Sequence, residues 1–327
     1  MMDQANSTAA DFSKLLLALY GLSNELPIES FQDAALTLVK QVLPFDASMW
    51  GTATTAPEGI DVHTLHLHQK SPQMMLDYTP MKHFDTAAAS LYAVPQATRG
   101  FNSASWFGAP HEREFLDYLQ RYEQNNIFIT TRHDAPTRFM HWISLFRADP
   151  DAHCRPEEER LLDLLAPHLM QALAMNRVIH LQRLSASAPS MGAAIADLRG
   201  VVYHRDTLFD ALLQREWEGW RGGPLPTRVI QAFHSGRGRF LGSHIVITHR
   251  AEHGLLFLSC RTRCRVDELT AREHTIAQLV AKGSSYKEIA KMLDRSPATV
   301  RNHIQAIYAK LGVGSIAGLI EELHRAG

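Results

Sequence analysis

The spacing of apolar residues in the first half of the chain changes between a helical period and alternation, which predicts a mixed α+β domain. Over 11–43, leucines and valines recur every three or four residues in two stripes, and the second stripe ends before Pro44. DASMWGTAT and IDVHTLHLHQ then predict two strands, and the second alternates cleanly between Thr64 and His68. The part over 71–125 carries short helical patterns. NIFITTRHD and FMHWISLFRAD follow as two further strands. They are joined through Ala135–Pro136–Thr137, so they predict a hairpin.

A long helical pattern over 155–184 ends this first domain. Pro156 stands at its start, and the three glutamates that follow suit the positive end of the helix dipole. Leucines, alanine, methionine and isoleucine then recur at helical spacing up to Ile179. Pro167 lies inside the pattern and predicts a kink or a break. A helix of this length could continue past the proline as a dimer seam.

A short polar stretch, SASAPSMG at 185–192, predicts a linker between two modules. The second module, over 193–264, carries two strands joined at Arg199–Gly200, two short helical stretches and a hairpin that turns near Glu252–Gly254. This order of elements is typical of a small α+β domain. From residue 265 to the end of the chain, the pattern is helical.

The last part of the chain predicts four short helices with clear start signals. Thr270 begins the first one, with a glutamate three residues later as in a capping box, and Ser285 begins the second. Ser296 and Pro297 begin the third, in which Val300, Ile304, Ile307 and Leu311 form an apolar stripe. The second and third helices are joined by a tight turn, which predicts a helix-turn-helix.

The third helix also carries polar residues that its packing does not explain. Arg301, Asn302 and Gln305 are offset from the apolar stripe and therefore share another face. Between 282 and 310 the chain has six Lys or Arg and two Asp or Glu, a local charge of +4 in a chain whose net charge is −1. A basic surface of this kind suits phosphate contact, and Arg, Asn and Gln are side chains that contact base edges in the major groove. The alternative is an ordinary solvated helix face.

A family resemblance favours the first interpretation. The stretch LTAREHTIAQLVAKGSSYKEIAKMLDRSPATVRNHIQAIYAKLGV resembles the DNA-binding domain of the LuxR/FixJ family of bacterial transcription regulators. The resemblance implies that Arg301, Asn302 and Gln305 face the bases, and that the DNA backbone is contacted by Lys287, Thr299 and Lys310. It also implies a double-stranded DNA operator as partner, and RNA polymerase as a further partner if the protein is an activator.

The two preceding modules carry weaker resemblances. The order of elements over 11–184 resembles a GAF-like sensor, and 193–264 is similar to a PAS-like domain. Such domains bind small molecules or dimerise. The candidates for contact with a small-molecule effector are Trp50, Tyr78, Phe84, Asp85, Tyr92, Trp106, Phe107 and Trp142. Two alternatives remain open at this point: a scaffold that dimerises without a ligand, and an enzyme over 1–184.

Composition and the placement of cysteines and histidines indicate the cellular location and the chemistry to expect. The sequence shows no signal peptide, no membrane span and only three cysteines, so a cytoplasmic protein without disulfides is expected. In HTLHLH at 63–68, His66 and His68 would share one strand face, with leucines on the other. We expect a polar outer face there and no metal, and we find no catalytic set and no cofactor motif.

These observations together predict two α+β sensor-like domains, GAF-like over 1–184 and PAS-like over 193–264, followed by an all-α four-helix domain over 265–327. The expected function is that of a DNA-binding transcription regulator, dimeric and responsive to an unidentified small molecule, rather than of an enzyme. A ligand-independent dimeric regulator is the alternative.

Overall fold

The computed structural model describes residues 2–56, 59–91, 94, 96–134, 139–185, 191–236 and 238–326. The chain divides into two compact units. The first consists of Met1–Leu184, Ile195–His204 and Ala251–Leu256, and the second of Ser185–Ala194, Arg205–Arg250 and Phe257–Gly327. In the described part of the chain, no helix is long and apolar enough to cross a membrane.

A five-stranded sheet forms the centre of the first unit. Its strands are β1 (Ala47–Ala56), β2 (Gly59–His68), β3 (Gln96–Asn102), β4 (Asn126–Asp134) and β5 (Phe139–Arg147). The order is β2-β1-β5-β4-β3, and each strand is antiparallel to its neighbours. The hairpin predicted from the two β-rich stretches is confirmed, since Asp134 pairs with Phe139 across β4 and β5. Its connection, Ala135–Pro136–Thr137, lies outside the described residues.

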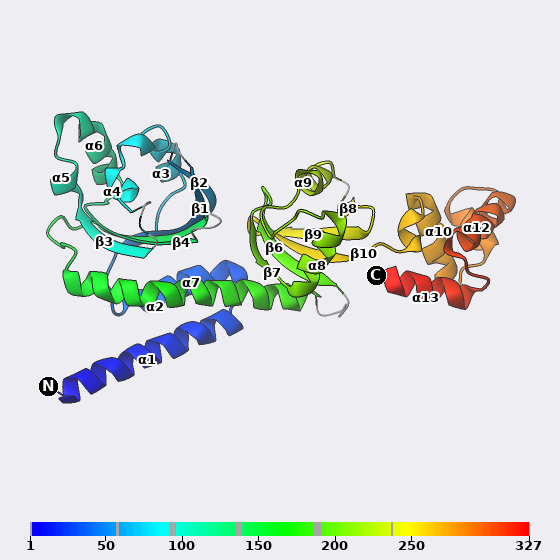
Figure 1. Cartoon of the computed structure of the whole chain (residues 1–327), viewed down its shortest axis with the longest axis horizontal. Coiled ribbons are helices and arrows are strands. Elements are labelled where there is room, and N and C mark those ends of the chain that lie inside the picture. The colour runs from blue at the N-terminus through cyan, green and yellow to red at the C-terminus, as the bar shows by residue number, and fades with distance from the viewer. Residues whose placement is uncertain are drawn as a thin grey trace. The chain divides into compact units, whose positions relative to one another are not determined.

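Helices cover both faces of this sheet (Figure 1). On one face lie α1 (Met2–Glu25), α2 (Ile28–Lys40) and α7 (Pro156–Ser185). On the other lie the short helices α3 (Gln73–Tyr78), η1 (Lys82–Phe84), α4 (Thr86–Ala89), α5 (Ser103–Trp106), η2 (Pro110–Glu112) and α6 (Arg113–Arg121). Because successive strand residues point to opposite faces, Ile143 and Leu145 of β5 pack with the long helices, while Phe146 packs with the short ones.

Helix α7 is continuous through Pro167, so of the expected kink or break, the break is wrong. Leu165, Ala166 and Leu169 on either side of the proline are buried in the core that α7 shares with α1 and α2. This burial holds the helix together where the proline removes one backbone hydrogen bond.

At the start of α7, Glu158 accepts hydrogen bonds from Arg147 of β5, at 2.8 Å for Nη2 and 3.1 Å for Nη1.

The expectation that His66 and His68 form a solvated outer face is also wrong. In the register of β1 and β2 they pair with Trp50 and Ser48, which are buried, and Trp50 lies in the core beneath the long helices. The two histidines therefore point toward the face that α1, α2 and α7 cover, and His68 is only 8% exposed. The sequence pattern showed the alternation but not that helices would cover the face with the histidines.

A second five-stranded sheet has the order β7-β6-β10-β9-β8. Its strands are β6 (Gly192–Asp197), β7 (Val202–Arg205), β8 (Arg239–Leu241), β9 (Ile245–Glu252) and β10 (Leu255–Thr262), with α8 (Thr207–Glu216) and α9 (Thr227–His234) between β7 and β8. The predicted turn between Glu252 and Gly254 is confirmed: His253 and Gly254 have φ of 51° and 74°, and β10 begins at the next residue.

The C-terminal part of the second unit is helical, as predicted. It contains η3 (Arg265–Glu268), α10 (Ala271–Ala281), α11 (Tyr286–Met292), α12 (Pro297–Leu311) and α13 (Ile316–Ala326). The expected caps are present, because Thr270 accepts from the backbone N–H of Glu273, Ser285 from that of Glu288, and Ser296 from that of Thr299. Gly312 ends α12 in the left-handed conformation, with φ of 69°.

Candidate functional site

Helices α11 and α12 form a helix pair joined by a tight turn. The turn is short because Asp294 adopts a left-handed conformation with φ of 50°, and the backbone N–H of Arg295 donates to the carbonyl of Ala290 at 2.9 Å. Ala290 and Ile289 of α11 are buried together with Val300 of α12. The small side chain of Ala290 lets the two helices approach closely, which fixes how α12 is presented.

One face of α12 is buried and the neighbouring face is exposed. Val300, Ile307 and Leu311 are buried in the core of the helical domain. Arg301, Asn302 and Gln305 are all exposed, so the structure places the three predicted base-facing residues on one accessible edge. Asn302 and Gln305 carry amides that can pair with adenine, and Arg301 carries the fork that suits guanine.

Arg301 is held in place by a ring from the preceding helix. Its guanidinium carbon lies 4.7 Å from the ring centroid of Tyr286, the first residue of α11. This cation–π contact restricts the rotamers of the arginine and leaves its planar fork available. Tyr286 was not among the predicted residues, because nothing in the local pattern links residues fifteen positions apart on two helices.

The three residues predicted to contact the DNA backbone have different surroundings. Lys287 and Thr299 are exposed, and the hydroxyl of Thr299 lies 2.8 Å from that of Ser296. The ammonium of Lys310 donates to both carboxylate oxygens of Glu273, at 2.7 and 2.8 Å. An ammonium carries three protons, so one remains for a phosphate oxygen.

Glu273 links three parts of the helical domain. Its carboxylate also accepts from the backbone N–H of Thr270 at 2.8 Å, which completes the capping box of α10. The hydrogen bond from Lys310, followed by that from Thr270, lowers the pKa of Glu273 below its usual range. The carboxylate therefore stays charged and keeps Lys310 at the end of α12.

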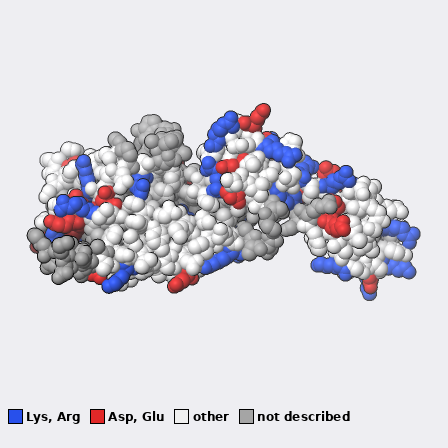
Figure 2. Space-filling model, turned by 60° about the horizontal axis from the view of Figure 1, so that its bottom comes forward, with Lys and Arg blue, Asp and Glu red and all other residues white. Residues whose placement is uncertain are grey.

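Part of the surface of this domain is basic. Figure 2 shows several Lys and Arg side chains on the helical domain, with some Asp and Glu on the same face. The sequence has a local charge of +4 between residues 282 and 310. A surface of this kind attracts the phosphate backbone of nucleic acids.

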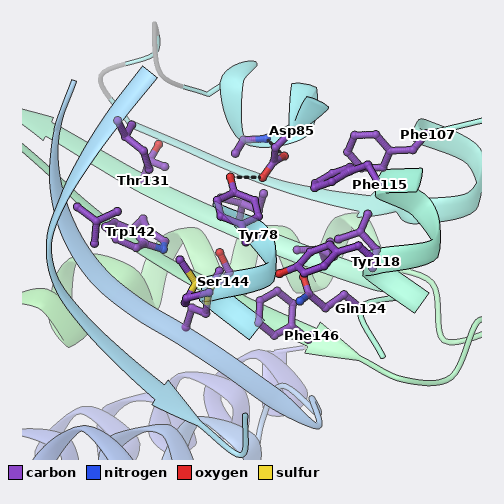
Figure 3. A pocket seen from close by; sticks show the side chains of 18 of the residues that line it. Tyr78, Asp85, Phe107, Phe115, Tyr118, Gln124, Thr131, Trp142, Ser144 and Phe146 are labelled. Atoms are coloured by element: carbon purple, nitrogen blue, oxygen red, sulfur yellow. Dashed lines mark hydrogen bonds between the residues drawn. The ribbon is translucent and has the colours of Figure 1, made fainter. Parts of the chain in front are cut away.

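A second candidate site is a cavity in the first unit, between the sheet and the short helices (Figure 3). The cavity is lined by Met49, Ile60, Val62, Met75, Tyr78, Asp85, Ala88, Phe107, Phe115, Tyr118, Leu119, Gln124, Ile127, Ile129, Thr131, Met140, Trp142, Ser144 and Phe146. Its free volume is about 70 Å³, which is room for a few water molecules. A larger occupant requires the surrounding side chains to move.

The cavity includes some of the predicted effector contacts and not others. Tyr78, Asp85, Phe107 and Trp142 line it. Three of the other candidates do not. Trp50 lies on the opposite face of the sheet, the tilted ring of Phe84 contacts that of His83 with centroids 4.0 Å apart, and Trp106 is 43% exposed and donates to Thr86. Tyr92 lies outside the described residues.

Asp85 places a carboxyl group at the wall of this apolar cavity. It caps α4, accepting from the backbone N–H of Ala88 at 2.9 Å, and the hydroxyl of Tyr78 donates to its other oxygen at 2.9 Å. Burial raises the pKa of Asp85, and this effect outweighs the lowering by the two hydrogen bonds. The group is therefore easier to protonate than an exposed aspartate.

Thr131 is a second polar group at the cavity, and sequence reasoning missed it. Its hydroxyl is buried and has no hydrogen-bond partner among the described residues. It lies on β4 two residues beyond Ile129, so both side chains point to the cavity face. The alternation of β4 could have indicated this face, but not that a cavity would lie beside it.

The geometry of α11 and α12 is that of a helix-turn-helix. Residues 267–323 match the family described as bacterial regulatory proteins, luxR family. The chain is 42% identical over 59 residues to the spore germination protein GerE of Bacillus subtilis, covering 18% of this chain and 80% of GerE. The chain therefore belongs to the LuxR family of bacterial regulatory proteins.

Other similarities cover a small share of the relative or have low sequence identity. An HTH-type transcriptional regulator of Mycobacterium tuberculosis is 46% identical over 59 residues, which cover 18% of this chain and only 7% of that relative. The match to the crystal structure of Escherichia coli SdiA covers 96% of this chain and 96% of the SdiA chain, with 14% sequence identity and a TM-score of 0.39.

Proposed function

We propose that the protein is a dimeric transcription regulator that contacts an operator through Arg301, Asn302 and Gln305 and responds to a small molecule bound in the first unit. The observation that carries the DNA-binding part is the exposed polar edge of α12, which lies beside a buried apolar stripe in a LuxR-family domain. The helix would lie in the major groove, where these three side chains can contact base edges.

Each DNA-contacting residue has a separate role. Arg301 donates both arms of its fork to a guanine, while Asn302 and Gln305 pair with bases on the same strand or its complement. Lys287, Thr299 and the remaining N–H of the Lys310 ammonium contact phosphates and set the register of the helix on the duplex. Two copies of the chain would occupy two half-sites about one helical turn apart.

The dimer would use the long helices of the first unit. Leu164 and Met175 are exposed apolar residues of α7, and their separation of eleven residues places them on one side of the helix. Leu17 of α1 is 71% exposed, although its neighbours Leu15 and Leu19 are buried. We place the contact between two copies on these surfaces, which follows the seam expected for the long helix.

The effector would be a largely apolar molecule with a hydrogen-bonding group. Aromatic side chains make up much of the cavity wall. Asp85 and the hydroxyl of Thr131, which has no partner within the described part of the chain, are polar groups at which a ligand can be oriented. Entry requires Tyr78 and its neighbours to shift, because the free volume is about 70 Å³. This shift would be the conformational signal, and an activator would pass it on through contact with RNA polymerase.

A gel-shift series on one operator and one scrambled duplex tests the DNA contacts. Arg301→Ala should lose discrimination between the two duplexes by about 1–3 kcal/mol. Lys287→Ala should weaken both alike and flatten the dependence on salt. Arg228→Ala, an exposed arginine of α9, is the control and should change neither. Unchanged discrimination by Arg301→Ala would refute the assignment of α12.

A ligand-independent regulator is the second candidate, and the small cavity favours it. If the first unit serves only assembly, extraction of the purified protein should release no small molecule in a stoichiometric amount. A screen of apolar metabolites should then leave the thermal midpoint unchanged, since only a ligand that binds the folded state raises it. A ligand that co-purifies in a stoichiometric amount, or one that raises the thermal midpoint, would support the ligand-responsive regulator and contradict the ligand-independent one.

A further inference from the structure

A cluster of three potential metal ligands lies at the edge of the first sheet, on the face opposite the cavity. Asp33 belongs to α2, and His66 and His68 belong to the edge strand β2. The two histidines are two positions apart in a strand, so their rings lie side by side on one face. Because α2 packs on that face, the carboxylate of Asp33 reaches both rings.

The donor atoms converge closely. Oδ1 of Asp33 lies 2.7 Å from Nδ1 of His68 and 3.0 Å from Nε2 of His66. All three donor atoms lie within 4.8 Å of one another. A tetrahedral Zn²⁺ with bonds of about 2.0–2.2 Å needs donor atoms about 3.3 Å apart. Small rotations of the three side chains therefore suffice to enclose an ion.

The cluster is also accessible. The side chain of Asp33 is 53% exposed, that of His66 is 21% exposed and that of His68 is 10% exposed. An ion can thus enter from solvent at Asp33, while the imidazoles on the strand are held by the packing beneath the helix. The ring of Phe45 lies edge-on to His68, with centroids 6.2 Å apart, and limits its rotation.

The hydrogen bonds between Asp33 and the two histidines by themselves contribute little to the stability of the fold. An ion pair whose carboxylate is half exposed contributes little to stability. Two imidazoles and a carboxylate form a donor set that binds zinc, with one coordination position left for water or another ligand. A set of nitrogen and oxygen donors excludes neither cobalt nor nickel but disfavours calcium and magnesium.

We propose that Asp33, His66 and His68 form a binding site for one divalent transition-metal ion, with Zn²⁺ favoured, that ties α2 to the edge strand β2. Binding replaces the contacts of Asp33 Oδ1 with the two rings by three bonds to the ion. Each imidazole then presents a lone pair at the coordinating nitrogen and keeps its proton on the other one. The remaining coordination position faces solvent.

Titration of the full-length, untagged, metal-free chain with Zn²⁺ tests this site. We expect one tight equivalent of Zn²⁺ by calorimetry, and a visible absorption band typical of four-coordinate Co²⁺ when cobalt is used. His68→Gln and Asp33→Asn should each weaken binding by at least about 100-fold, more than the loss that follows removal of a supporting outer partner. His111→Gln removes an exposed histidine of the same unit and should leave binding unchanged.

Folding of the variants is controlled separately. Asp33→Asn keeps an oxygen that accepts from an imidazole, so its circular dichroism and its thermal midpoint in EDTA should match those of the wild type. Zn²⁺ should raise the midpoint of the wild type and not that of Asp33→Asn. Absence of a stoichiometric Zn²⁺ site in the wild type, or equal affinity in Asp33→Asn and the wild type, overturns the proposal.

Discussion

The guanidinium of Arg301 lies over the ring of Tyr286, with 4.7 Å between the guanidinium carbon and the ring centroid. The contact joins the first residue of α11 to the exposed edge of α12. An arginine that is already held in one orientation loses less conformational entropy when it binds a base. Tyr286 is therefore a positioning residue for the proposed base contact.

Replacement of Tyr286 by alanine should lower sequence discrimination without removing it. The expected loss is about 0.5–1 kcal/mol, the usual contribution of an exposed cation–π contact. Tyr286→Phe keeps the ring and should behave as the wild type. The measurement is the ratio of affinities for the operator and a scrambled duplex. Equal weakening of both duplexes by Tyr286→Ala would show that the ring acts on general DNA affinity instead.

Thr131→Val should stabilise the protein in the absence of a ligand. The hydroxyl of Thr131 is buried without a partner among the described residues, and valine fills the same space without an unsatisfied polar atom. We expect a gain of about 1 kcal/mol, visible as a rise of a few degrees in the thermal midpoint.

Thr98→Val is the matched control on the neighbouring strand β3. The hydroxyl of Thr98 lies 2.8 Å from that of Thr130 and donates to Asp163 at 2.9 Å, so its removal should cost about 1 kcal/mol. Opposite signs for the two variants are the expected result. Destabilisation by both would mean that the Thr131 hydroxyl is hydrogen-bonded in solution.

Glu158 should make the first unit sensitive to acid. Burial by itself would raise the pKa of Glu158, but the hydrogen bonds from Arg147 and Arg155 outweigh it and lower the pKa to about 2. A carboxyl group with a lowered pKa in the folded state stabilises the protein above its unfolded pKa, and this contribution disappears as the pH falls toward the folded value.

The test compares the wild type with Glu158→Gln by urea unfolding at several pH values. At pH 7 we expect the wild type to be more stable by about 2–3 kcal/mol. The difference should shrink between about pH 4.5 and pH 2, because both chains then carry a neutral group at this position. A difference that stays constant from pH 7 to pH 3 would contradict this role.

The sequence by itself determined the helical domain almost completely. Each helix start there is signalled within three or four residues, as by Thr270 with Glu273 and by Ser285 with Glu288. Local hydrogen bonds of this kind need no knowledge of the rest of the chain. The exposed edge with Arg301 followed directly, because the apolar stripe of α12 leaves only one side for polar residues.

Only the tertiary structure decided which distant groups meet. Alternation along β1 and β2 indicated two faces, but the sheet order and the helix layers settled that Trp50 and His68 lie on one face and the cavity on the other. The partners of Lys310 and His68 are 37 and 35 residues away, on other elements. Such contacts arise from packing of whole elements, which depends on long-range strand pairing that no local pattern encodes.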